Sequence, residues 1–148
     1  MKRPDFMGLA LAEAEAAALR GEVPIGAVLA LGGDVVAAAG NRTRELNDPT
    51  AHAEMLAIRE AANRLSAERL TDADLYVTLE PCTMCAAAIS FARIRRLYFA
   101  APDPKGGAVE SGVRFFRQPT CHHAPEVYGD IGEARAAELL KDFFRLRR

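Results

Sequence analysis

Four residues have the types and the spacing that metal-assisted or redox chemistry requires. His52 and Glu54 are two positions apart in "HAE", and Cys82 and Cys85 are three apart in "PCTMC". Residues i and i+3 share one face of a helix, so both sulfur atoms can reach one point. We expect both motifs at helix N-termini, where the partial positive charge favours thiolates. Thiolates bind metals, and they are equally the reactive form in disulfide exchange.

The histidine distinguishes between these chemistries, because the cysteine pair alone also fits a dithiol redox protein or a structural zinc module. One imidazole nitrogen and two sulfur atoms fill three of the four positions of a tetrahedral zinc site, and the sequence offers no convincing fourth ligand. An open position is typical of catalytic zinc, which lowers the pKa of bound water to about 7 and provides a hydroxide nucleophile. We therefore predict one catalytic Zn²⁺ per chain, held by His52, Cys82 and Cys85.

Glu54 is predicted to act as the general acid and base. Positions i and i+2 do not share a face within a regular helix, so His52 and Glu54 cannot both point directly at the metal. The carboxylate is expected to reach around to the bound water and to carry protons as a shuttle. If Glu54 were the fourth ligand, the site would be closed and the water lost.

Hydrophobic periodicity and turn residues predict alternating helices and strands around these motifs. We expect helices over residues 5–20, 51–65, 81–92 and 131–147, and strands over 23–31, 35–39, 75–79, 94–100 and 126–129. "GGD" is a hairpin signal between the first two strands, and Pro81 is expected at the first position of its helix. The alternation predicts an α/β sandwich with helices packed over a central sheet. A length of 148 residues predicts a single domain.

Composition indicates an ordinary globular protein of a reducing compartment. Half of the residues are hydrophobic and 26% are charged. Three cysteines are too few for a secreted disulfide framework, so reduced thiols and a cytoplasmic location are expected. The apolar stretch near the N-terminus is too short for a signal peptide, and no segment is long enough to span a membrane.

The net charge of −1 conceals an asymmetry between the two halves of the chain. Residues 1–80 hold 8 Lys and Arg against 13 Asp and Glu, whereas residues 81–148 hold 11 against 7. The tail "DFFRLRR" places three arginines beside two phenylalanines. This tail is either a solvated helix end, whose cations suit the helix dipole, or a basic patch that binds phosphates.

Several segments resemble bacterial tRNA-specific adenosine deaminases. They are "VPIGAV", "GNR", "DPTAHAEMLAIREA", "LYVTLEPCTMCAAAI", "DPKGGA" and the closing "LLKDFFRLRR". The H-x-E…P-C-x-x-C signature itself is shared by the zinc deaminases. The resemblance implies a cytidine-deaminase-like, three-layer α/β/α sandwich around a five-stranded mixed sheet, and a homodimer. It also implies hydrolytic deamination of adenosine to inosine at the wobble position of a tRNA anticodon stem-loop.

The resemblance implies further roles for residues outside the metal motifs. Asn41 would hydrogen-bond the flipped-out base, Asp103 and Lys105 would belong to a substrate loop, and Phe144 and Arg145 would lie near the anticodon loop. Each has a simpler interpretation as well. Asn41 could bond its own loop, "DPKGGA" could be a surface turn, and Phe144 could pack the last helix on the core.

Two alternatives to a tRNA deaminase stay open from the sequence: a deaminase of small molecules, and a non-catalytic protein, either a dithiol redox protein or a module in which zinc only holds the fold. A deaminase of free bases or nucleosides, such as guanine or cytosine, would share every zinc residue.

The segment 113–125 departs from the family pattern, and its Cys121, His122 and His123 could suggest a second metal site. Consecutive histidines point in different directions, so we interpret these three as incidental loop residues.

Overall fold

The structure, a computed structural model, describes residues 4–146, so Arg147 and Arg148 of the basic tail lie outside the described residues. The regular elements follow one another along the chain as helices, strands and one short 3₁₀ helix. They are α1 (Phe6–Leu19), β1 (Gly26–Leu31), β2 (Asp34–Gly40), α2 (Ala53–Leu65), β3 (Ala73–Leu79), α3 (Thr83–Phe91), β4 (Arg96–Ala101), η1 (Phe115–Arg117), β5 (Glu126–Tyr128) and α4 (Glu133–Leu146).

The five strands form one mixed sheet in the order β2-β1-β3-β4-β5. β1 pairs antiparallel with β2 and with β3, whereas β3–β4 and β4–β5 are parallel pairs. The predicted β1–β2 hairpin is confirmed. Gly32 and Gly33 form its two-residue turn with φ of 60° and 87°, and such a turn needs positive φ at both positions.

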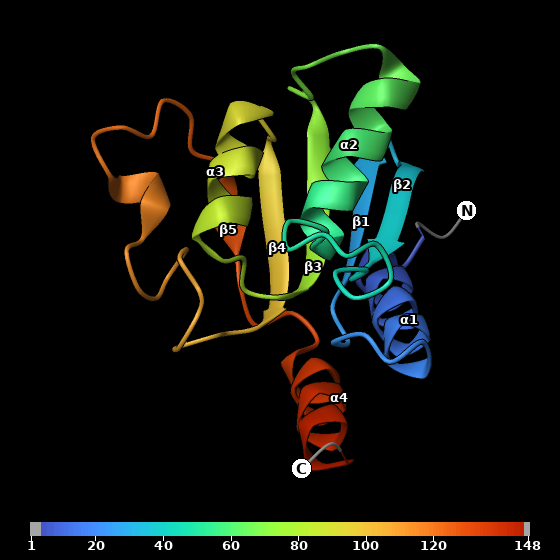
Figure 1. The fold of residues 1–148 in the computed structure, drawn as a ribbon. Coiled ribbons are helices and arrows are strands. Elements are labelled where there is room, and N and C mark those ends of the chain that lie inside the picture. The colour runs from blue at the N-terminus through green and yellow to red at the C-terminus, as the bar shows by residue number, and fades with distance from the viewer. Residues whose placement is uncertain (1–3, 147–148) are drawn as a thin grey trace.

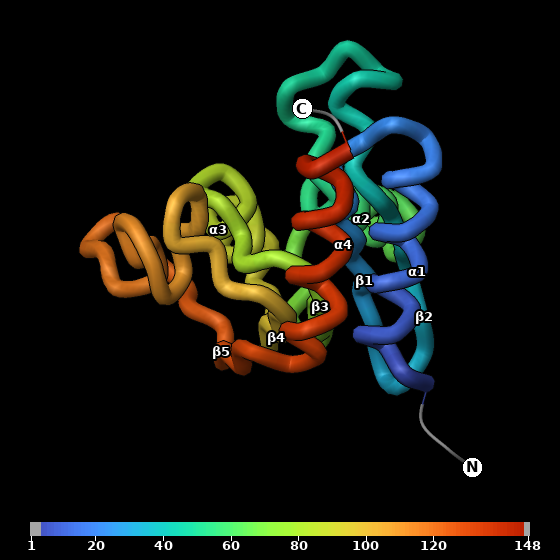
Figure 2. Tube along the Cα trace, turned by 90° about the horizontal axis from the view of Figure 1, so that it is seen from below, coloured from blue at the N-terminus to red at the C-terminus, as the bar shows by residue number. Residues whose placement is uncertain are grey.

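Helices cover both faces of this sheet, which confirms the predicted three-layer α/β/α sandwich (Figure 1). α2 and α3 pack on one face, and α1 and α4 lie side by side on the other (Figure 2). Side chains alternate between faces along each strand, so Leu29 and Leu75 enter the core under α2 and α3. Their neighbours Val28 and Tyr76 pack on the opposite side under α1.

Small residues let α1 lie directly on the β1–β2 hairpin. A Cβ atom at Gly26 would lie 2.0 Å from the carbonyl oxygen of Ala10. A Cβ atom at Gly40 would lie 2.8 Å from the carbonyl oxygen of Glu13. The two glycines therefore allow α1 to pack in direct contact with the backbone of the hairpin.

The two helices that carry the chemical motifs begin later than predicted. α2 begins at Ala53 rather than at residue 51, because His52 has an extended backbone (φ −73°, ψ 152°) as N-cap. α3 begins at Thr83, because Cys82 is extended as well (φ −73°, ψ 176°). Pro81 is therefore not at the first helical position, and that prediction is wrong. His52 and Cys82 are thus the residues immediately before the first turn of α2 and of α3.

The other boundaries differ from the predicted ones by a few residues. β1 begins at Gly26 rather than at residue 23, since Ile25 donates its N–H to the carbonyl of Val23 in a tight turn. Periodicity did not predict the short 3₁₀ helix η1 within 113–125. Within residues 4–146, no helix combines the length and the apolar character needed to cross a membrane.

Candidate active site

The beginnings of α2 and α3 bring His52, Cys82 and Cys85 together. His52 and Cys82 are the N-caps of the two helices, and Cys85 lies in the first turn of α3. Nδ1 of His52 is 3.7 Å from Sγ of Cys82 and 3.6 Å from Sγ of Cys85. The three ligand atoms all lie within 4.8 Å of one another. The three side chains thus converge as a shared metal ion would require.

The ionisation of these groups depends on the contacts that they make with one another. A hydrogen bond with Cys85 is the main cause that lowers the pKa of Cys82 to about 4, and His52 contributes to the same shift. The same hydrogen bond, together with burial, raises the pKa of Cys85. Hydrogen bonding with Cys82 raises the pKa of His52. Cys82 is therefore the more readily ionised of the two thiols, and a cation bound among these atoms would have to displace a proton from Cys85 and keep His52 neutral.

Glu54 lies beside this group without belonging to it. It is in the first turn of α2, its side chain is buried, and it contributes no oxygen to the cluster of three ligand atoms. Burial is the main cause that raises the pKa of Glu54 to about 7, and the charge of Cys82 raises it further. A carboxyl group that gains and loses its proton near neutral pH has the property that a proton carrier needs, and this role of Glu54 stays a prediction.

A small cavity of about 130 Å³ opens beside the cluster. Its walls come from the loop before β1, the starts of α2 and α3, the end of β3 and the loop after β4. The lining residues are Ile25, His52, Glu54, Leu79, Glu80, Cys82, Asp103 and Gly106. The cavity therefore gives a ligand access to two of the predicted metal ligands, His52 and Cys82, and to Glu54 at once.

Asn41 is adjacent to the site, and its side-chain oxygen already has a partner in the protein. It follows β2 and is only 5% exposed. Its side-chain Oδ1 accepts a hydrogen bond from the N–H of Ala53 at 2.9 Å. Asn41 is also not among the residues that line the cavity. The oxygen of this carboxamide thus caps α2, and only the amide end remains for the predicted contact with a base.

Asp103 and Lys105 both lie in the loop after β4, but their environments differ. Asp103 lines the cavity, whereas Lys105 is exposed and is not among the lining residues. The carboxylate of Asp103 accepts the N–H groups of Lys105 at 3.2 Å and Gly106 at 3.0 Å. This side chain therefore shapes its own turn, which is the simpler of the two interpretations of this segment.

Phe144 and Arg145 lie on α4, which extends below the sheet in Figure 1. Phe144 is 52% exposed and meets the ring of Phe143 edge-on at 5.4 Å, whereas Phe143 is buried. Arg145 pairs with Asp142 at 2.9 Å. The core contact expected of a phenylalanine in this helix is made by Phe143, which leaves the ring of Phe144 on the surface.

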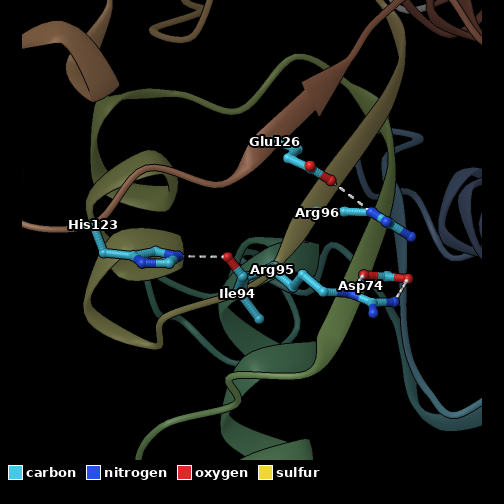
Figure 3. Close-up of polar contacts among 6 residues, drawn as sticks. All are labelled: Asp74, Ile94, Arg95, Arg96, His123 and Glu126. Atoms are coloured by element: carbon cyan, nitrogen blue, oxygen red, sulfur yellow. Dashed lines mark hydrogen bonds and ion pairs between the residues drawn. The ribbon is translucent and has the colours of Figure 1, made fainter.

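The segment 113–125 does not form a second metal site in the part of the chain that is described. Sγ of Cys121 contacts the carbonyl oxygen of His123 at 3.1 Å, and Nε2 of His123 lies 2.8 Å from the carbonyl oxygen of Ile94 (Figure 3). His122 is exposed. Within residues 4–146, the only cluster of three potential metal ligands is the one at His52. His123 instead attaches the segment to the turn before β4.

Comparison with known proteins places this site in a family. Residues 1–101 match the model of the cytidine and deoxycytidylate deaminase zinc-binding region. The chain is also 69% identical, over 99% of its length and 97% of the relative's, to a tRNA-specific adenosine deaminase of Agrobacterium fabrum. The chain belongs to the tRNA-specific adenosine deaminases of this family.

Two solved structures are informative for this deaminase. One comes from a study of A-to-I editing by tRNA:A34 deaminases at the wobble position of transfer RNA. It has 72% identity and a TM-score of 0.90, and the match covers 91% of this chain and 98% of that one. A guanine deaminase of Bacillus subtilis has 32% identity and a TM-score of 0.67, with 99% and 94% covered. The fold is thus shared with enzymes named for a free base, but the similarity is weaker.

The residues present in this deaminase fit a zinc ion. A nitrogen and two sulfur atoms are the donor set that zinc prefers, and they come from His52, Cys82 and Cys85. Cys82 and Cys85 are free thiols rather than a disulfide. The matched family region is itself zinc-binding. The structure and the family therefore support a zinc site at the cysteine pair rather than a redox-active dithiol.

The roles of two buried carboxylates of the deaminase were not recognised from the sequence. Glu22 is 1% exposed and accepts the N–H groups of Arg44 and Glu45, at 3.1 and 2.8 Å, in the loop that follows Asn41. Glu80 is 2% exposed and accepts hydrogen bonds from the loop after β4. A carboxylate directly after an apolar strand, as in "LYVTLEPC", is the signal that could have found Glu80.

Proposed function

We propose that this deaminase hydrolyses adenosine to inosine at the wobble position of a tRNA anticodon stem-loop and releases ammonia. The observation that carries the proposal is the convergence of His52, Cys82 and Cys85 beside the buried Glu54. The 69% identity to a tRNA-specific adenosine deaminase supports the choice of substrate. Residues 1–148 would form a single zinc-dependent deaminase domain acting in the cytoplasm.

In this proposal His52, Cys82 and Cys85 hold one zinc ion per chain. Zinc supplies Lewis acidity, which makes water a nucleophile near neutral pH. Glu54 carries the protons: its carboxylate takes one from the attacking water and gives it to the ring nitrogen next to the attacked carbon. A C–O bond forms in this step. Glu54 then takes the second proton of the same water from the new hydroxyl group and delivers it to the leaving amine, so that a C=O bond forms as the C–N bond breaks and ammonia departs. Such proton transfer typically contributes on the order of 100- to 10,000-fold in rate.

The residues around the cavity would hold the base and its loop. Asn41 would use its amide group as a donor to the base while its oxygen continues to cap α2. Asp103 and Lys105 would contribute the loop that borders the cavity. A base displaced from its stack can be read on its edges in this way, since single-stranded loops expose them.

The surface of α4 would contact the anticodon loop through Phe144 and Arg145. The exposed ring of Phe144 can stack on a base, and the guanidinium of Arg145 can bind phosphate.

We also propose a homodimer. The main support for it is the family resemblance, and Phe91 at the end of α3, which is 73% exposed, would be available to such an interface.

The test is incubation with the anticodon stem-loop of an arginine tRNA, followed by mapping of inosine. Free adenosine, guanine and cytosine are assayed in parallel. Inosine at the wobble position, with no turnover of the free compounds, is the expected result. Turnover of a free base or nucleoside without inosine in RNA would replace this proposal by the alternative of a small-molecule deaminase.

A further inference from the structure

Glu80 joins the loop after β4 to the strand that leads into the metal motif. It follows the last residue of β3 and precedes Cys82 by two positions. Its side chain is 2% exposed although it borders the cavity beside His52. A buried carboxylate is costly unless it is hydrogen-bonded, so the partners of Glu80 indicate what it does.

All partners of this carboxylate come from residues 103–111. Oε1 accepts the N–H of Asp103 at 2.9 Å and the hydroxyl of Ser111 at 3.0 Å. Oε2 accepts the N–H groups of Val109 at 3.1 Å, Glu110 at 2.9 Å and Ser111 at 2.9 Å. A carboxylate offers about four lone-pair sites, so these five donors saturate it. Glu80 and Glu54 line the same cavity, but the lone pairs of Glu80 are already occupied. Glu80 is therefore unavailable as a second proton carrier.

The loop is fitted closely around Glu80. A Cβ atom at Gly107 would lie 2.5 Å from Cδ of Glu80 and 2.6 Å from the carbonyl oxygen of Asp103. Next to it, Ala108 donates its N–H to the carbonyl of Pro81 at 2.9 Å. The loop is therefore attached at two consecutive residues, Glu80 and Pro81, directly before the metal-binding turn.

We propose that Glu80 is a positioning residue for substrate, which holds the 103–111 loop in place as the wall of the cavity. This rests on the proposed function. With Glu80 in place, Asp103 and Gly106 stay at the cavity without a substrate, so that binding does not have to order the loop. Without it, the competent loop conformation is a minor state, and the apparent affinity falls by the fraction populated.

The first test compares Glu80→Gln with the matched control Glu126→Gln. Gln keeps the shape of the side chain but replaces one acceptor by an NH₂ group, which cannot accept the N–H of Asp103. Glu126 is an exposed glutamate in β5, paired with Arg96 at the opposite end of the sheet (Figure 3). We expect KM for the stem-loop to rise about tenfold in Glu80→Gln, with kcat changed less than about twofold. Glu126→Gln should match the wild type.

The second measurement does not depend on activity. Hydrogen exchange of the backbone amides at 103–111 should be faster in Glu80→Gln than in the wild type, whereas zinc content should be equal. A purely structural role of Glu80 would lower thermal stability without this local change. If the wild type makes no inosine, the proposed function fails by itself, and hydrogen exchange still decides whether Glu80 holds the loop.

Gly107→Ala disturbs the same contact from the loop side and leaves Glu80 intact. It should raise KM and speed exchange at 103–111 as Glu80→Gln does. Because both changes break one contact, their combination should have less effect than the two effects added. Gly107→Ala decides the matter if Glu80→Gln does not fold. A fall in kcat at unchanged KM, or unchanged KM and exchange in the folded variants, overturns the proposal.

Discussion

The side chain of Asn41 caps the helix that begins next to His52, since its Oδ1 accepts the N–H of Ala53 at 2.9 Å. A residue expected to contact the substrate thus also supports a predicted metal ligand. His52 makes no side-chain cap of its own, so Asn41 supplies the acceptor that the first turn of α2 requires. The two uses of Asn41 can be separated, because they need different ends of the carboxamide.

Asn41→Asp keeps an acceptor for Ala53 and removes the amide donor, whereas Asn41→Ala removes both. We expect Asn41→Ala to lose about 1 kcal/mol of unfolding free energy, the usual contribution of an N-cap, together with activity. Asn41→Asp should lose activity while its denaturation midpoint stays closer to that of the wild type. Full activity in Asn41→Asp would mean that Asn41 acts only as a cap. Denaturant unfolding and kcat/KM on the stem-loop make the comparison.

Glu54→Gln should abolish turnover while zinc stays bound. Gln preserves the volume of the buried side chain but cannot take up and release a proton, so kcat should fall at least about 100-fold. Steady-state kinetics and elemental analysis of the same preparation provide the two measurements. Equal zinc content excludes loss of the metal as the cause. A variant with undiminished kcat would remove Glu54 from the mechanism.

Cys85→Ser should remove zinc, and Cys121→Ser should not. Cys85 contributes one of the three converging ligand atoms, whereas Cys121 contacts His123 and, near the C-terminal end of α3, Ser90. We expect one zinc per chain in the wild type and in Cys121→Ser, and a marked deficit in Cys85→Ser. A chelator should likewise inactivate the wild type. A metal-free wild type with a reversible Cys82–Cys85 disulfide would favour the dithiol redox interpretation instead.

The adjacent phenylalanines of α4 should respond in opposite ways to truncation. Phe143 is 4% exposed, so Phe143→Ala should cost about 3 kcal/mol of stability. Phe144 is 52% exposed, so Phe144→Ala should leave the melting temperature nearly unchanged and should raise KM for the stem-loop several-fold, as loss of a stacked base contact does. Thermal unfolding and kinetics on the same RNA test both. Unchanged KM in Phe144→Ala would exclude α4 from the RNA contact.

The candidate metal site could be proposed from the sequence because its signals lie in two short motifs. A histidine and a Cys-x-x-Cys pair each lie at a predicted helix start, one after a loop and the other after a strand. Their residue types and spacing already indicate zinc with an open position. The α/β layering followed in the same way from alternating periodicities. The mixed order of the sheet came from resemblance, since parallel and antiparallel pairing is not visible in periodicity.

Residues whose role depends on distant partners could not be predicted in this way. Glu80 and Glu22 look like ordinary surface glutamates until loops from elsewhere in the chain donate their backbone N–H groups to them. Phe143 and Phe144 are chemically identical neighbours, and only the packing of α4 decides which ring is buried. Burial and hydrogen bonding are properties of contacts between segments, and those contacts exist only once the chain has folded.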